Sequence, residues 1–319
     1  MQTSPVFRAK VRYAVRGFFD ERGYTEVETP ALTRHPDLEP SLSYLETEVN
    51  VRGEAPERRA LITSPEYAHK KLVAQGISRT FELARVFRNN EPSDAWHSAE
   101  FTMLEWYRLG ASLEDGMEET MALIEGVAKN ATGQAQASVN GVHIPLERAF
   151  WDVRTVASLM EEHAGLTLPV HPTRETYAEW LDVAGLFYEP TDTISDLFQR
   201  VMLNLVDPVL VRASRPTVVA YYPWHEASLA RIDKEGWAER FEVLIGGIEL
   251  CNAYGELTDV GEQRRRFEAE IVLRQERGQG VYPIDEELLQ ALEHIKQPLF
   301  GNALGFDRLV TLLSSQTEN

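Results

Sequence analysis

The sequence predicts an α+β fold built around a largely antiparallel sheet. Segments with strand-like alternation and segments with helical periodicity both occur along the 319 residues, but they follow no βαβ rhythm. The dipeptide Gly246-Gly247 stands between two apolar runs, which is a strong signal for a tight hairpin between antiparallel strands. No GxGxxG motif is present, so nothing predicts a doubly wound dinucleotide-binding sheet.

The first half of the chain begins with a helix. Ser4-Pro5 is a favourable helix start, apolar residues then recur at helical spacing, and Gly23 is a favourable stop. The pattern then predicts a strand over 24–30, a helix from Ser64 to Gly76, strands over 80–87 and 101–109 joined by a polar loop, and a helix over 112–128.

The second half mixes helices with the hairpin. Small polar residues over 129–140 predict a loop, and helical stretches are expected at 153–163 and 175–184. The hairpin over 240–250 follows, and a glycine-spaced strand beginning at Gly301 runs into a helix near Arg308.

Composition excludes several classes of protein. The chain is 43% hydrophobic and 26% charged, and no apolar run reaches the roughly 20 residues that span a bilayer. The N-terminus lacks the pattern of a secretory signal, and the one cysteine, Cys251, cannot form an internal disulfide framework. A cytoplasmic location is therefore expected. The net charge of −18 disfavours broad nucleic-acid affinity.

The glycine-spaced strand is the most informative segment. Small residues at Gly301, Ala303 and Gly305 leave one strand face bare, which is typical of close approach by something flat. Arg308 follows at the beginning of a helix, where it suits a phosphate. A nucleotide site is one interpretation, and a strand that simply packs against a helix is the other.

A second candidate site lies on the strand over 101–109. Alternation places Phe101, Met103, Glu105 and Tyr107 on one face. A carboxylate and a phenol beside apolar residues suit a cation. The alternative is a solvent-facing glutamate on an edge strand.

The hairpin carries a pair of carboxylates. A two-residue turn pairs Ile245 with Ile248, which makes Glu242 and Glu249 diagonal neighbours on one face. A nearby nucleotide would make Mg²⁺ the cation between them, since Mg²⁺ favours one or two carboxylates plus phosphate oxygens. A pair of exposed glutamates is the alternative. In a regular strand, the side chains of Glu249 and Asn252 would point to opposite faces. A bulge or turn must therefore intervene if both face one site.

In combination, three segments resemble the class II aminoacyl-tRNA synthetase catalytic domain of the lysyl type. The segment 23–30 resembles the first class II motif, which forms the dimer interface in that family. Val86-Phe87-Arg88-Asn89 through Phe101 resembles the second motif, and 301–308 resembles the third. The resemblance covers nearly the whole chain and is weakest over about 130–215. It implies a class II synthetase-like antiparallel sheet flanked by helices, and a homodimer.

The resemblance narrows further, to the truncated lysyl-tRNA synthetase paralogues that attach (R)-β-lysine to a lysine of translation elongation factor P. The segments 63–67, 101–107 and 226–230 closely resemble the corresponding sequences of that family. The chain also begins at the first catalytic helix, so residues 1–319 are expected to form one catalytic domain without the anticodon-binding domain. Ala303 stands where lysyl-tRNA synthetases have glycine and the paralogues have alanine, which is tied there to preferring the β-amino acid.

The resemblance implies roles at the nucleotide. Arg88 would hold the α-phosphate of ATP and the carboxylate region of the substrate. His97 and Phe101 would contact adenine, and Arg308 would pack on the other side of the ring and reach the γ-phosphate. Glu242 and Glu249 would hold Mg²⁺.

It also implies roles at the amino acid. Glu66 would bind the amino group near the reacting end, and Asn252 would bind the carboxylate. Glu105, Tyr107 and Glu256 would enclose the distal ammonium. Two carboxylates and a phenol select a cation, whereas an aspartate-like side chain would need Arg or Lys there.

The second motif departs from the family pattern. Asn90 stands where glutamate is usual, Glu91 follows one residue later, and the loop to Phe101 is one residue longer. Ala95 and Trp96 stand where an arginine usually precedes the loop histidine, His97. Either Glu91 reaches the site through the insertion, or activation is slow, or the chain has left the parent reaction.

Three functions follow from these observations. The first is ATP-dependent activation of lysine or (R)-β-lysine as an adenylate, followed by transfer to elongation factor P. The second is the same activation with another acceptor. The third is a catalytically impaired protein that binds lysine or a nucleotide. Charging of tRNA ranks below all three, because the surface is acidic and the anticodon-binding domain is not expected.

Overall fold

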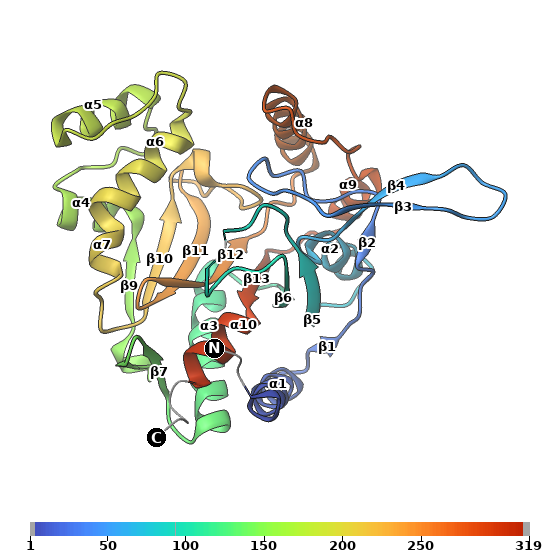
Figure 1. Ribbon diagram of the computed structural model, residues 1–319, viewed down its shortest axis with the longest axis horizontal. Helices are drawn as coiled ribbons and strands as arrows, with labels where there is room; N and C mark the ends of the chain where they lie inside the picture. The colour runs from blue at the N-terminus through green and yellow to red at the C-terminus, as the bar shows by residue number, and fades with distance from the viewer. Residues whose placement is uncertain (1–3, 93, 315–319) are drawn as a thin grey trace.

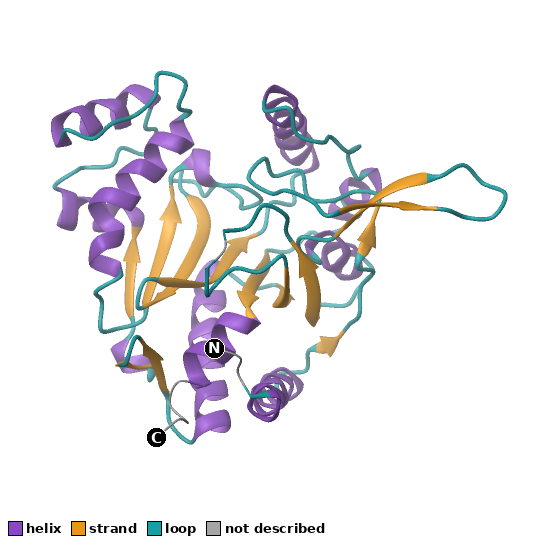
Figure 2. Ribbon diagram, viewed as in Figure 1, coloured by secondary structure: helices purple, strands orange, loops and turns teal. Residues whose placement is uncertain are grey.

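The computed structural model describes residues 4–92 and 94–314, and an eight-stranded sheet forms its centre (Figures 1 and 2). In spatial order the strands are β1 (Thr25–Glu26), β5 (Arg79–Phe87), β6 (Glu100–Leu109), β13 (Leu299–Gly305), β12 (Ile248–Gly255), β11 (Ala238–Ile245), β10 (Thr217–Tyr222) and β9 (Asp152–Thr155). Only the outermost pairs, β1–β5 and β9–β10, are parallel among the described strands. The expected largely antiparallel α+β fold is confirmed.

Helices flank this sheet. They are α1 (Pro5–Asp20), α2 (Glu66–Ala74), α3 (Leu113–Thr132), α4 (Val156–Ala164), α5 (Arg174–Ala184), α6 (Ile194–Val201), α7 (Asp207–Leu210), α8 (Val260–Glu276), α9 (Glu286–Leu292) and α10 (Phe306–Ser314). Buried residues of α1, α3 and α10 share one core with the sheet, while α4–α7 gather beside β9 (Figure 1). No described helix is long and apolar enough to cross a membrane.

Two small sheets and three short helical turns complete the described chain. The small sheets are formed by β2 (Leu32–Thr33), β3 (Glu46–Val49) and β4 (Glu57–Leu61), and by β7 (Gln136–Val139) and β8 (Val142–Pro145). The turns are Arg148–Phe150, Met202–Val206 and Trp224–Glu226. The β3–β4 hairpin projects from the body of the protein (Figure 1).

Strand β6 shows how alternation divides the two faces of the sheet. Leu104 and Trp106 are fully buried in the core formed with α1, α3 and α10. Glu105 and Tyr107 alternate with them along the strand and so face the opposite side of the sheet. The face opposite that core therefore carries the polar side chains.

The hairpin forms at the predicted glycines. Gly246 and Gly247 have φ values of 58° and 78°, the two positive φ angles of a type I′ turn, which suits the twist of antiparallel strands. Ile245 pairs with Ile248 and Leu244 with Glu249. The predicted register is confirmed.

The prediction of a loop over 129–140 is wrong. Helix α3 continues to Thr132, because Ala131 is buried and Lys129 pairs with Glu125 one turn earlier at 2.5 Å. Gly133, with φ of 85°, ends the helix. Strand β7 then occupies 136–139.

Two element boundaries also differ from expectation. The strand expected over 24–30 is only two residues long, because the backbone N–H and the hydroxyl of Thr29 donate to Glu82 at 3.0 and 2.9 Å. The helix expected at 153–163 begins at Val156, since Thr155 caps it and the residues before belong to β9. Polar capping and side-chain contacts decide both boundaries.

Candidate active site

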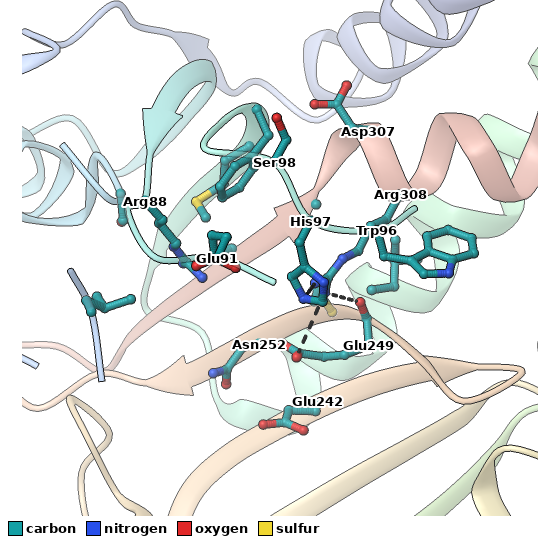
Figure 3. Close-up of a pocket in the computed structure, with 18 of the residues that line it drawn as sticks. Arg88, Glu91, Trp96, His97, Ser98, Glu242, Glu249, Asn252, Asp307 and Arg308 are labelled. Carbon is teal, nitrogen blue, oxygen red and sulfur yellow. Dashed lines mark hydrogen bonds and ion pairs between the residues drawn. The ribbon is translucent and has the colours of Figure 1, made fainter. Parts of the chain in front are cut away.

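A cavity of about 1030 Å³ opens over the polar face of the sheet (Figure 3). Nine of the residues predicted from the sequence line it: Glu66, Arg88, His97, Phe101, Glu242, Glu249, Asn252, Ala303 and Arg308. Glu105, Tyr107 and Glu256 are not in its lining. Their relative exposures are 1%, 2% and 1%, so they lie beneath the cavity wall.

The sheet register explains how residues far apart in sequence meet. Glu242 pairs with Asn252, Asn252 with Ala303, and Ala303 with Glu105. These four residues form one row across β11, β12, β13 and β6. Because cross-strand neighbours lie on the same face, all four belong to the cavity side of the sheet.

A bulge brings Glu249 onto the same face. The β11–β12 register shifts between Val243 and Leu244, so that Glu242 faces Asn252 while Leu244 faces Glu249. The extra residue on β12 interrupts the regular alternation of side chains between Glu249 and Asn252. Both side chains therefore lie on the same face of the sheet. The bulge that the sequence required is confirmed.

Glu105 forms the centre of a buried acidic pocket. Its carboxylate accepts hydrogen bonds from the Tyr107 hydroxyl at 2.6 Å and the Ser64 hydroxyl at 2.8 Å. Burial, and then the nearby Glu66 carboxylate, raises the pKa of Glu105 to about 8. No ion pair to Glu105 occurs in residues 4–92 and 94–314. The solvent-facing interpretation of this residue is therefore wrong.

Lys70 is a site residue that sequence reasoning missed. Its ammonium nitrogen lies 2.5 Å from a Glu66 oxygen and 2.6 Å from a Glu256 oxygen, with 1% of the residue exposed. Burial opposes its charge, but the two carboxylates hold the pKa of Lys70 above its usual value. Burial raises the pKa of Glu256 to about 8 despite this partner. The i,i+4 spacing of Glu66 and Lys70 was the signal that could have found it.

The bare strand face is only partly open. A Cβ at Gly301 would lie 2.1 Å from a Glu256 oxygen and 2.4 Å from a Tyr107 ring carbon. Protein side chains, not a ligand, therefore fill the space over Gly301. Only Ala303 and Gly305 of the glycine-spaced face line the cavity.

Arg88 directly follows β5 and reaches the cavity. Its guanidinium carbon lies 5.5 Å from the centre of the Phe101 ring. Its Nε is buried without a hydrogen-bond acceptor, and Arg88 forms no ion pair in the described part of the chain. A partly buried guanidinium that forms no ion pair is suited to an anionic ligand.

Arg240 is a second residue that sequence reasoning missed. It donates to Glu242 at 2.6 Å and to Asn252 Oδ1 at 3.2 Å, and so occupies part of the expected metal position. Its alternation with Glu242 on β11 was the available signal. Glu249, the other expected metal ligand, has a side chain that is 48% exposed.

The carboxylates fit a metal ion only in part. No group of three or more His, Cys, Asp or Glu side chains suited to a metal occurs within the described residues. Glu249 projects into the cavity, and Glu242 keeps one oxygen that Arg240 does not bind. Two carboxylates fit Mg²⁺ that takes its remaining ligands from phosphate and water.

The longer loop after β5 rearranges the second motif. Asn90 has a φ of 59° and its side chain donates to the Ser43 hydroxyl, outside the cavity lining. Glu91, the next residue, does line the cavity (Figure 3). Of the alternatives, the structure supports the one in which Glu91 reaches the site through the insertion.

The same loop is joined to the third motif. His97 accepts a hydrogen bond from Arg308 at 3.1 Å, and its other ring nitrogen lies 2.8 Å from Asp94. Arg308 also donates to the Glu249 backbone carbonyl at 2.6 Å. His97 and Arg308 thus lie together in the cavity.

Comparisons with known proteins agree with this architecture. The sequence profile of the family described as "tRNA synthetases class II (D, K and N)" matches residues 1–318. The "Elongation factor P--(R)-beta-lysine ligase" of Pectobacterium atrosepticum is 38% identical over 96% of this chain and 89% of its own length. The protein of the same name from Haemophilus ducreyi is 34% identical over 96% and 88%.

A lysine-specific tRNA ligase matches over a smaller share of its length. The "Lysine--tRNA ligase" of a Synechococcus species is 34% identical over 96% of this chain but 62% of its own length. The profile and both kinds of relative match nearly the whole of this chain. The chain therefore belongs to the class II aminoacyl-tRNA synthetase family of the D, K and N type.

Proposed function

We propose that this protein is an ATP-dependent ligase that activates lysine or (R)-β-lysine and transfers it to a lysine side chain of translation elongation factor P. Two relatives that bear the name of this ligase match over 88–89% of their own lengths. The Synechococcus tRNA ligase matches over 62%. The similarity over nearly full length favours the protein acceptor.

The assignment of the substrate rests on the buried acidic pocket. Glu66, Glu105 and Glu256 supply three carboxylates, and Lys70 offsets one of them. When all four groups are ionised, a charge of −2 remains. Lysine and β-lysine each carry two ammonium groups, so a diamino acid neutralises the pocket while an amino acid with a neutral side chain does not.

The first chemical step is the attack of the substrate carboxylate on the α-phosphorus of ATP. A new O–P bond forms, and the bond to the β-phosphate oxygen breaks to release pyrophosphate. Arg88 would neutralise charge at the α-phosphate and Arg308 at the γ-phosphate. Mg²⁺ held by Glu242 and Glu249 would add charge neutralisation at the phosphates. No enzyme nucleophile is required, since positioning and electrostatics are sufficient.

The second step is transfer. The neutral amine of the acceptor lysine attacks the carbonyl carbon of the adenylate. The C–N bond of an amide forms, the C–O bond to AMP breaks, and the amine loses a proton. The buried thiol of Cys251 takes no part, because burial raises its pKa above the usual range.

Ala303 favours (R)-β-lysine over α-lysine. Its methyl group lies between Asn252 and Glu105 in the row across the sheet, where the substrate carboxylate and distal ammonium are assigned. A methyl group there takes up space beside the substrate backbone. It suits a substrate whose amino group is one carbon further from the carboxylate.

We also propose a homodimer in the cytoplasm. The segment at β1 corresponds to the first class II motif, and the neighbouring helix α1 leaves Val6 and Tyr13 79% and 81% exposed. These side chains are available to a second copy. The charge of −18 agrees with a partner other than tRNA.

The first experiment is ATP–pyrophosphate exchange with purified protein and either α-lysine or (R)-β-lysine. We expect exchange with a preference for β-lysine. Adding elongation factor P and ATP should then increase the acceptor mass by one β-lysyl group, and the increase should vanish when the acceptor lysine is changed to arginine.

Other outcomes would change the assignment. Exchange without transfer to elongation factor P would direct the search to another acceptor. Lysine binding without any exchange would contradict the ligase and favour a sensor.

A further inference from the structure

We propose that Asp94 is a positioning residue for ATP: it holds His97 in the tautomer that accepts a hydrogen bond from Arg308, and thereby fixes Arg308 before ATP arrives. Asp94 belongs to the altered part of the second motif, where a cation is usual in the family. The inference rests on the proposed use of ATP and adds a residue to it.

Asp94 makes two kinds of contact. Its Oδ1 accepts hydrogen bonds from the backbone N–H groups of Trp96 at 2.7 Å and His97 at 2.9 Å. Both carboxylate oxygens also lie near His97 Nδ1, at 2.9 and 2.8 Å. The backbone contacts shape the loop, and the contact to Nδ1 orients the imidazole ring. These hydrogen bonds lower the pKa of Asp94, with the Trp96 N–H contributing most.

The partners of His97 determine its tautomer. Arg308 Nη2 lies 3.1 Å from His97 Nε2, and a guanidinium can only donate. His97 Nε2 must therefore accept, which places the proton of the neutral ring on Nδ1. Nδ1–H donates to the Asp94 carboxylate. This contact keeps the ring proton on Nδ1 and leaves Nε2, on the other side of the ring, as the hydrogen-bond acceptor.

Arg308 is consequently held from two sides. His97 accepts from Nη2, and the Glu249 backbone carbonyl accepts from Nη1 at 2.6 Å. Holding the side chain in place before binding removes part of the entropy cost of ordering it around a nucleotide. Arg308 matters more in this chain because Ala95 and Trp96 supply no cation. Of the cavity's other described arginines, Arg240 is already paired with Glu242.

Asp94→Asn separates the two kinds of contact. The asparagine side chain keeps one oxygen for the Trp96 and His97 N–H groups, so the loop can retain its turn. Its amide nitrogen takes the place of Oδ2, the oxygen 2.8 Å from Nδ1, and presents a donor where the carboxylate accepted, which favours the tautomer protonated on Nε2 that opposes Arg308. Asp233→Asn is the matched control. Asp233 also accepts two backbone N–H groups, at 2.8 and 2.9 Å, but it does not line the cavity.

Two measurements test the proposal. ATP affinity is measured by calorimetry, and the protonation of each His97 ring nitrogen is measured by ¹⁵N NMR on the free protein. We expect Nδ1–H in the wild type and Nε2–H in Asp94→Asn. We also expect about tenfold weaker ATP binding in that variant, the effect of one hydrogen bond to a charged group. Lysine affinity and the Asp233→Asn variant should change by less than about twofold.

Opposite results overturn the proposal in distinguishable ways. An Nε2–H tautomer in the wild type contradicts the hydrogen-bond argument directly. Unchanged ATP affinity in Asp94→Asn, with normal binding by the wild type, contradicts the positioning role alone. Absence of ATP binding by the wild type contradicts the proposed function and this role together.

Discussion

The two ends of the cavity are held in place by different means. At the proposed amino-acid end, Glu105, Tyr107 and Ala303 lie on central strands of the sheet, and Lys70 lies on a helix packed against it. At the proposed nucleotide end, His97 and Glu91 lie on an irregular loop whose shape depends on single hydrogen bonds. The sheet end follows the family, and the loop end departs from it. A change at the first end should alter the fold or the substrate, and a change at the second should alter ATP binding.

The largest effect is expected from Lys70→Met. The change leaves Glu66 and Glu256 facing each other without the cation that lies between them. Breaking a buried ion pair from one side costs about 3–5 kcal/mol, so the free energy of unfolding should fall by that amount. Denaturant unfolding followed by circular dichroism measures it. The double variant Lys70→Met/Glu256→Gln should recover part of the loss, and a larger loss in the double variant would contradict this account.

Arg88→Met should abolish most of the activity while sparing the fold. Removal of one charged group aimed at the developing transition-state charge costs about 10²–10³-fold in rate. Pyrophosphate exchange measures the loss. Arg85→Met is the control, because Arg85 lies on β5 only three residues before Arg88 and its side chain is 58% exposed beside Glu100. Equal losses of exchange rate in the two variants would show that Arg88 contributes only its positive charge and no specific contact with ATP.

The acidic pocket should make substrate affinity depend on pH. Glu105 has a raised pKa of about 8, so it is mostly protonated at pH 6, and an ammonium group binds only its ionised form. Affinity for (R)-β-lysine should therefore fall by up to about tenfold for each pH unit below 8. Calorimetry from pH 6 to 8.5 measures it. Glu105→Gln should bind (R)-β-lysine more weakly, and its affinity should change less with pH. If the dependence of affinity on pH does not change in this variant, another group must titrate.

Ala303→Gly should have the smallest effect. Loss of one methyl group gives α-lysine more room without removing a polar contact. The ratio of kcat/KM for β-lysine to that for α-lysine should fall by about tenfold, since one methylene-sized change is worth about 1–3 kcal/mol in discrimination. Pyrophosphate exchange with both substrates measures the ratio. A ratio that does not change would assign the preference elsewhere in the cavity.

The sheet end was predictable because strand alternation and a two-glycine turn determine which residues meet. The pairing of Leu244 with Glu249 follows from the turn alone, and the need for a bulge followed from the parity of Asn252. Lys70 was missed because it lies on helix α2, whereas its partner Glu256 is nearly two hundred residues away and directly follows β12. Its proximity to Glu66 in sequence does not show that both are buried.

The loop end could not be predicted in the same way. Nothing in the periodicity indicates that Asn90 adopts a positive φ or that Glu91 then lines the cavity. Local hydrogen bonds from the Trp96 and His97 N–H groups to Asp94 shape the loop. The unpredicted helix end at Thr132 has a related cause, because burial of Ala131 outweighs the polar character of its neighbours.

The row formed by Asn252, Ala303 and Glu105 has a consequence for how substrate length can change in evolution. Adjacent strands lie about 4.8 Å apart, so the backbones that carry Asn252 and Glu105 are about 10 Å apart. That separation is set by main-chain hydrogen bonds and cannot be adjusted gradually. Adaptation to a shorter or longer diamino acid must therefore proceed by exchanging side chains at these positions, and of the three residues Ala303 is the one that can change without removing a polar group.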